Sequence, residues 1–134
     1  MGCCSSCIQY QKELKEQYKI YGKNTNWMSE YFPLLKDKSV FEMIIPGSHN
    51  SGTYNVSKSL KNECKCQNIS INRQLDLGIR FLDFKYCRKG DKKNDVWICN
   101  RSARGMKFTI AMQEIKTFLF FHSKEFIIVR LNQD

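Results

Sequence analysis

Residues 45–54, Ile45-Pro46-Gly47-Ser48-His49-Asn50-Ser51-Gly52-Thr53-Tyr54, continue the apolar run of residues 40–45. That run predicts a buried strand, and Pro46 and Gly47 end it abruptly. His49, one of only two histidines in the chain, then stands in a loop of small and polar residues. Because α/β proteins place their chemistry in loops at the C-terminal ends of parallel strands, we expect His49 to lie in a functional site.

The length and composition are those of a single globular domain. The chain has 134 residues, of which 42% are hydrophobic, enough for one core. It contains no apolar run of roughly 18 residues, so we expect no transmembrane helix. Its first residues also lack the charged and apolar regions of a secretory signal peptide.

The chain is strongly basic, with a formal net charge of +9. Much of the excess lies in residues 85–104, which hold seven Lys or Arg against two Asp. A basic surface suits anionic lipid, phosphate esters or nucleic acid. A solvated lysine-rich surface explains the same charge. No nucleic-acid-binding motif accompanies the charge, so we expect no nucleic-acid partner.

The cysteines do not form a recognisable framework. Their number is odd, and no C-x-x-C pair has a matching second pair, which argues against structural disulfides or a tetrahedral zinc site. Reduced thiols in a cytosolic setting are the simplest interpretation. The seven are Cys3, Cys4, Cys7, Cys64, Cys66, Cys87 and Cys99.

Residues 1–25 are predicted to form an acylated segment. Gly2 fits the acceptor position of the N-myristoylation pattern, and Ser6 fits its Ser/Thr position. A single myristoyl chain binds membranes only marginally, so stable anchoring needs a second acyl chain or a basic patch. Candidates for palmitoylation are the neighbouring Cys3, Cys4 and Cys7. The pattern predicts lipid anchoring at the cytoplasmic face of a membrane; a disordered, cysteine-bearing terminus is the alternative.

Residues 8–21 are predicted to be an amphipathic helix that Gly22 ends. One stripe is apolar and aromatic, and lysines lie on the opposite face. Packing of this stripe against the outside of the domain is one interpretation, and a basic helix at a membrane surface is the other. The stripe consists of Tyr10, Leu14, Tyr18 and Tyr21.

Residues 26–134 are predicted to form one domain of alternating helices and buried strands, which favours an α/β fold with a parallel sheet. Asn26 is expected to cap a short helical turn. Loops are expected at residues 55–67 and 100–105. The strands are expected at residues 40–45, 79–86, 96–99 and 125–131, and the helices at 69–78 and 108–121.

The second expected strand carries polar residues in an otherwise apolar run. Asp83 and Lys85 are two residues apart, so they point to the same face. Ionised groups in such a strand need partners or a polar strand end, which suggests a site. A surface strand with alternate residues in solvent is the alternative.

Two blocks of the chain together resemble the phosphatidylinositol-specific phospholipase C X region. Residues 45–53 resemble its first strand and catalytic loop, and residues 74–84 resemble its second block. Residues 126–129 match the strand after the next helix, so the resemblance covers roughly residues 27–132. Residues 66–71 are most similar to the glycosylphosphatidylinositol-cleaving branch found in protozoa.

The resemblance implies a fold and a reaction. The fold is the N-terminal half of a TIM-type β/α barrel, with about four parallel strands and a leading amphipathic helix. The reaction is cleavage of a phosphodiester in phosphatidylinositol or glycosylphosphatidylinositol, in which the inositol 2-hydroxyl attacks phosphorus. His49 matches the general base, a role that suits an imidazole.

The resemblance also implies how charge on the phosphoryl group is neutralised. Asn50 and Asp83 match positions that bind calcium in the calcium-dependent members. Lys85 falls where those members have a carboxylate and the metal-free members have arginine, and a cation there opposes a metal. We therefore expect metal-free catalysis with Asp83 and Lys85 as catalytic groups, and calcium as the alternative cofactor. Asn50, Arg80 and Arg101 are expected to bind phosphate, with Arg80 as a lesser or structural contributor.

The chain departs from the family pattern in two respects. The family's second histidine, the general acid, is replaced by Cys99-Asn100-Arg101, and His122 falls at the wrong end of a helix to serve. The chain also stops after the fourth expected strand, whereas a barrel has eight. It is then a truncated product, a half that pairs with a second chain, or a degenerate relative.

Two functions from different classes remain. The first is a lipid-anchored phospholipase C-like phosphodiesterase. The second is a non-catalytic membrane module that binds inositol phospholipid headgroups through Lys85, Arg101 and the basic loops.

Overall fold

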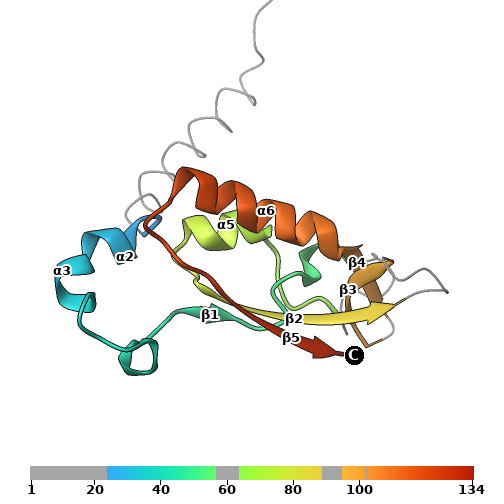
Figure 1. The fold of residues 1–134 in the computed structure, drawn as a ribbon. Coiled ribbons are helices and arrows are strands. Elements are labelled where there is room, and N and C mark those ends of the chain that lie inside the picture. The colour runs from blue at the N-terminus through green and yellow to red at the C-terminus, as the bar shows by residue number, and fades with distance from the viewer. Residues whose placement is uncertain (1–23, 57–63, 89–94, 102) are drawn as a thin grey trace, which may run out of the picture.

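The computed structural model describes residues 24–56, 64–88, 95–101 and 103–134, which form one sheet with helices packed on it (Figure 1). The acylation pattern and the helix expected at residues 8–21 lie outside these ranges. Within them, no helix is long and apolar enough to cross a membrane.

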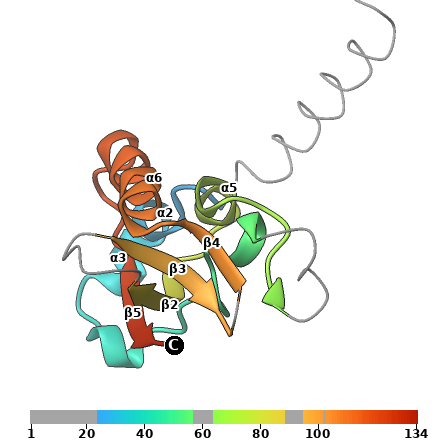
Figure 2. The same cartoon turned by 90° about the vertical axis from the view of Figure 1, so that its right-hand side faces the viewer.

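The parallel part of the sheet has β2 at its centre. β1 (Gly47–Ser48) pairs with one edge of β2 (Phe81–Arg88), and β5 (Ile128–Gln133) pairs with the other. All three strands run in the same direction, and β5 follows β2 in register over six residue pairs. The curled sheet with helices on one side confirms the predicted α/β class and partial barrel (Figures 1 and 2).

The third expected strand is present but antiparallel. β3 (Val96–Asn100) returns along β2, and β4 (Ala103–Lys107) pairs back onto β3. Only residues 89–95 separate β2 from β3, whereas a parallel crossover needs a dozen or more residues. The prediction of four parallel strands was therefore wrong. The expected loop at residues 100–105 instead holds the end of β3 and the first three residues of β4.

Two helices cover the same side of the sheet. α6 (Phe108–Phe121) has the predicted bounds, and α5 (Ile71–Asp76) is shorter than the predicted 69–78. The Ser70 side chain caps α5 by accepting from the Arg73 amide, and Gly78, at φ 98°, ends the turn that follows. The buried core between helices and sheet consists of Ile71, Leu75, Leu82, Phe84, Ile98, Met106, Ala111, Ile115 and Phe118.

The segment before β1 differs most from expectation. It contains short helices, α2 (Trp27–Glu30) and α3 (Phe32–Leu35), and a 3-10 turn η1 (Val40–Glu42). Ser39 and Glu42 form a capping box that fixes this turn, so the expected strand at residues 40–45 is wrong. Asn26 precedes α2 but makes no side-chain capping bond, contrary to prediction.

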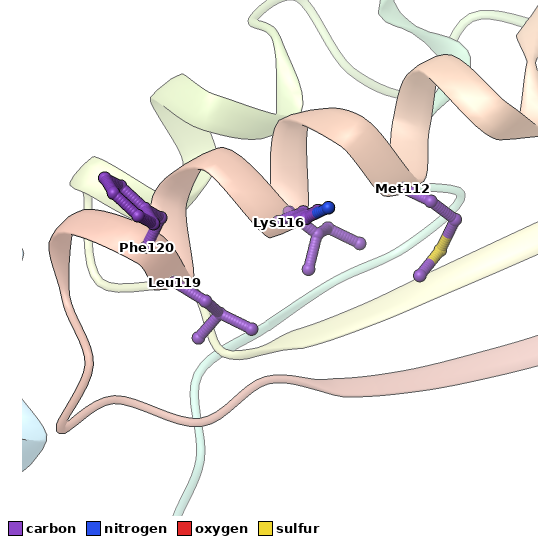
Figure 3. Close-up of a pocket in the computed structure, with 5 residues that line it drawn as sticks. Met112, Lys116, Leu119 and Phe120 are labelled. Atoms are coloured by element: carbon purple, nitrogen blue, oxygen red, sulfur yellow. The ribbon is translucent and has the colours of Figure 1, made fainter.

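Apolar side chains remain exposed beside the helices and the sheet edges. Ile44 is 98% exposed and Phe120 79%. An apolar hollow of about 410 Å³ runs along one side of α6, lined by Met112, Ile115, Lys116, Leu119 and Phe120 (Figure 3). Among the described strands, β1 and β5 pair only with β2, so their outer edges are open there.

A buried ion pair joins the N-terminal helices to the sheet. The Arg80 guanidinium lies 2.8 Å from Glu125, and both side chains are fully buried. Arg80 also donates to the carbonyls of Leu75, Ile79 and Thr25. Burial lowers the pKa of Arg80, and Glu125 opposes that shift.

Glu125 completes this connection. It accepts hydrogen bonds from the backbone amides of Met28 and Ser29 and from the Ser29 hydroxyl. The pair therefore fixes α2, the end of α5 and the loop between α6 and β5 around the start of β2.

We expect Arg80→Leu to lower the free energy of unfolding by about 3–5 kcal/mol, because it leaves the Glu125 carboxylate buried without its cation. Arg130→Leu is the matched control. The Arg130 side chain is 62% exposed, and its loss should cost less than about 1 kcal/mol. Urea denaturation of both variants measures the difference; equal losses would contradict a structural role for the buried pair.

Candidate active site

The loop that follows β1 is bound tightly to β2. The Ser51 amide donates to the Asp83 carbonyl at 2.7 Å, and the Asp83 amide donates to the Ser51 hydroxyl at 2.9 Å. Gly52 allows the loop to approach β3 closely, since a Cβ there would lie 2.7 Å from Ile98 Cγ2. Asn50 has a left-handed φ of 46°, which asparagine tolerates better than most residues. The position of His49 is therefore fixed by its own backbone neighbours.

His49 and Asp83 form the central pair of the site. His49 Nδ1 lies 3.1 Å from Asp83 Oδ2, with the imidazole 70% exposed and the carboxylate side chain 11% exposed. Since a carboxylate accepts, Nδ1 carries the proton, and Nε2 of the neutral ring has the lone pair. The Asn50 side-chain amide donates to that Nε2 at 2.9 Å. Once a substrate hydroxyl takes the place of the Asn50 amide, the Nε2 lone pair of this oriented imidazole can accept its proton.

The Asp83 carboxylate is held from β5 as well. Asn132 donates to Asp83 Oδ1 at 3.2 Å, and Arg130 Nε lies 4.0 Å from the same oxygen. Sequence reasoning missed both residues. Both can be assigned to the site only once the residue pairing of β2 with β5 is known, because that pairing places Arg130 opposite Asp83.

The other sequence-predicted cations are distributed unevenly. Lys85 shares the Asp83 face of β2 and lies 3.9 Å from Asp134 Oδ1. Arg101 is exposed at the turn after β3, with φ 54°. Arg80 does not reach the site, because an odd spacing from Asp83 places it on the opposite face of the strand, where it is fully buried. Its predicted role in phosphate binding is therefore wrong, and its buried pair with Glu125 fits the structural alternative.

The donors around Asp83 do not suit calcium. Calcium takes six to eight oxygen ligands at short range, whereas the Asp83 oxygens already accept from His49, Asn50 and Asn132. The Arg130 cation lies 4.0 Å from Asp83 Oδ1, and Lys85 is on the same face of β2. Within the described ranges, no group of three or more His, Cys, Asp or Glu residues is placed to hold a metal ion.

A thiol borders the same site. The Asn50 amide that contacts His49 also donates to Cys66 Sγ at 3.3 Å. Asn100, at the end of β3, donates to Cys66 Sγ at 3.6 Å and to the Cys64 carbonyl at 2.9 Å. Gln67 donates to the His49 carbonyl at 2.7 Å, which joins this segment to the catalytic loop.

Comparison with known proteins identifies the family. The model of the phosphatidylinositol-specific phospholipase C X domain matches residues 41–134, more than half of the chain. The chain therefore belongs to the phosphatidylinositol-specific phospholipase C X-domain family.

Relatives and solved structures agree with that membership. Human "PI-PLC X domain-containing protein 2" is 27% identical over 133 residues, covering 81% of this chain and 43% of the relative. A double mutant of the phosphatidylinositol-specific phospholipase C from Staphylococcus aureus superposes with a TM-score of 0.74 at 26% identity, over 85% of this chain and 37% of that one. The Listeria monocytogenes enzyme gives 0.66 at 26%, over 81% and 38%. The chain thus spans less than half the length of these proteins.

The finer resemblance and the residue roles stay predictions. Relatives come from human, zebrafish and Dictyostelium, and they do not establish closeness to the protozoan glycosylphosphatidylinositol-cleaving branch. The roles of His49, Asp83 and Lys85 rest on their geometry and on the match to the motif.

We expect two-bond ¹H–¹⁵N NMR of the histidine rings to show His49 as the Nδ1–H tautomer. Asp83→Ala should convert it to a mixture of both tautomers, since the acceptor that fixes the proton is gone. The His122 signals are the internal control, because that ring contacts Asn26 at 2.7 Å and should not change. An unchanged His49 tautomer in Asp83→Ala would refute the orienting role of the carboxylate.

Proposed function

We propose that the chain is a phosphodiesterase of the phospholipase C type that acts on phosphatidylinositol or glycosylphosphatidylinositol lipids. The observation that carries the proposal is the His49–Asp83 pair at the end of β1, in a chain of the X-domain family. Two solved structures with the same fold are phosphatidylinositol-specific phospholipases C. Inositol lipid is therefore the substrate class to test first.

His49 acts as general base on the inositol 2-hydroxyl. Asp83 holds the Nδ1 proton, so the Nε2 lone pair takes the hydroxyl proton while the oxygen attacks phosphorus. In the resting site, Nε2 accepts from the Asn50 amide, and the incoming hydroxyl takes the place of that amide. Because the nucleophile belongs to the substrate, the protein supplies orientation and a base rather than a covalent side chain.

Cations at the same end of the sheet stabilise the charge that develops on the phosphoryl oxygens. Lys85 acts from the Asp83 face of β2 as a point charge. Arg130, opposite Asp83 on β5, has a 62% exposed side chain and can bind two oxygens together. Arg101 contributes from the turn after β3. This scheme requires no metal.

The strands that complete a barrel are part of the proposal. The described sheet leaves the outer edges of β1 and β5 open, and a β/α barrel has eight strands. A second chain that pairs with these edges would enclose the end of the sheet where His49 lies.

We expect His49→Ala to lower turnover by about 10²–10⁴-fold, the usual contribution of a general base. The measurement is ³¹P NMR of the water-soluble inositol phosphates released from phosphatidylinositol vesicles and, separately, from glycosylphosphatidylinositol. His122→Ala is the matched control, because that histidine lies beside Asn26 and stacks on Phe118. Turnover should be equal with calcium and with a chelator.

Absence of turnover by the unaltered chain on both lipids, with and without calcium, would contradict the enzymatic proposal. It would favour a non-catalytic module that binds inositol phospholipid headgroups through Lys85 and Arg101. The observation that supports this second candidate is the replacement of the family's second histidine by Asn100 and its neighbours. Vesicle binding that survives His49→Ala without turnover would identify it.

We further propose that the chain is anchored to the cytoplasmic face of a membrane by myristoylation of Gly2 and palmitoylation of Cys3, Cys4 or Cys7. The support is the sequence pattern alone, which provides two acyl signals where one is marginal.

Gly2→Ala should therefore move most of the protein from the membrane fraction to the soluble fraction, because palmitoylation depends on prior membrane contact. Fractionation of expressing cells measures it, with Ser5→Ala as the control at a position that the pattern leaves free. An unchanged membrane fraction in Gly2→Ala would refute the acyl anchor.

A further inference from the structure

The proposed reaction needs a proton for the leaving alcohol, and neither histidine of the chain can supply it. His49 is the base, and His122 lies beside Asn26, away from the site. The family's second histidine would fall at the end of β3, where Asn100 stands. Asn100 is 5% exposed and cannot act as an acid itself.

Asn100 instead directs its amide at a group that can. Its Nδ2 donates to Cys66 Sγ, and the same sulfur accepts from Asn50 Nδ2, the amide that contacts His49 Nε2. Cys66 therefore lies between the general base and the position where the family has its acid. Cys66 is exposed, whereas Asn50 and Asn100 are buried.

The other proton donors near His49 are held in hydrogen bonds of 2.7 or 2.8 Å, whereas the Cys66 thiol contacts the Cys64 carbonyl only at 4.0 Å. The Ser48 and Ser51 hydroxyls bond to one another, and Ser51 also contacts the Ser48 carbonyl. The Thr53 hydroxyl donates to the Asn50 carbonyl. The Asp83 carboxylate accepts on both oxygens. Of the described polar groups that touch Asn50 or His49, the Cys66 thiol alone is both exposed and able to release a proton.

We propose that Cys66 is the general acid of this site, an inference that rests on the proposed phosphodiesterase function. The bond between inositol O2 and phosphorus forms as the 2-hydroxyl proton passes to His49 Nε2. The bond between phosphorus and the glycerol oxygen breaks as that oxygen takes the Cys66 proton. The products are diacylglycerol and a cyclic inositol phosphate, and the site is left with an imidazolium and a thiolate.

Hydrolysis of the cyclic phosphate restores both groups. The Cys66 thiolate takes a proton from water as the water oxygen attacks phosphorus, and the His49 imidazolium returns a proton to inositol O2. The amides of Asn50 and Asn100 hold the sulfur in place through this cycle, because both are directed at Cys66 Sγ. Asn100 is thus a positioning residue for the acid.

Substrates that differ in the leaving group test the role directly. A diacylglycerol leaving group needs a proton, whereas a 4-nitrophenyl ester of inositol phosphate releases a stable phenolate that does not. We expect Cys66→Ala to lower turnover of the lipid by about 10²–10⁴-fold and to change turnover of the aryl ester less than about threefold. His49→Ala should lower both, since the base is needed in each case.

Controls separate this outcome from others. Cys87→Ala, which removes a half-buried thiol on β2, should leave both rates unchanged, and thermal melting of each variant verifies the fold. Asn100→Ala should reproduce the leaving-group selectivity of Cys66→Ala in weaker form. Equal losses on the two substrates in Cys66→Ala, or no loss on the lipid, would overturn the assignment. Absence of turnover of both substrates by the unaltered chain would instead refute the phosphodiesterase proposal.

Discussion

The ion pair between Arg80 and Glu125 is the interaction on which the described structure depends. It is fully buried, and its hydrogen bonds reach Thr25, the end of α5 and the first turn of α2. The pair lies at the start of β2, and Asp83 follows three residues later on the other face. Arg80, directly before β2, faces the helices, and Asp83, within β2, faces the opposite side. The buried ion pair therefore fixes the start of the strand that carries the candidate catalytic carboxylate.

The sequence was sufficient for the parts of the fold and site that depend on local pattern. The bounds of α6 follow from its apolar periodicity, and the His49 loop follows from its motif. It was insufficient where partners are distant in the chain. The contributions of Asn132 and Arg130 depend on the β2–β5 pairing, which joins residues far apart in the chain. The turn at residues 40–42 and the antiparallel β3 had local signals, the Ser39–Glu42 capping box and the short β2–β3 connection, but the apolar pattern outweighed them. The structural alternative for Arg80 follows from strand parity, since its odd spacing from Asp83 directs it to the opposite, buried face.

The site as described is built from contacts between backbone-fixed elements rather than from a mobile loop. Ser51 ties the His49 loop to Asp83 through both backbone groups of the aspartate. The polar residues that border the site include the amides of Asn50 and Asn100, and both amides donate to the exposed Cys66 thiol. Under the proposed mechanism, the Cys66 thiol takes the role of the family's second histidine, and the Asn100 amide is directed at its sulfur.

The Asn132 contact also sets an order of events during synthesis. His49 and Asp83 leave the ribosome well before the segment that locks the carboxylate, since Asn132 follows Asp83 by 49 positions. Chains grow at about 5–20 residues per second, so for several seconds a nascent chain holds the histidine without its oriented partner. The contact that holds the Asp83 carboxylate therefore forms only when β5 docks, and a chain clipped before Asn132 lacks it.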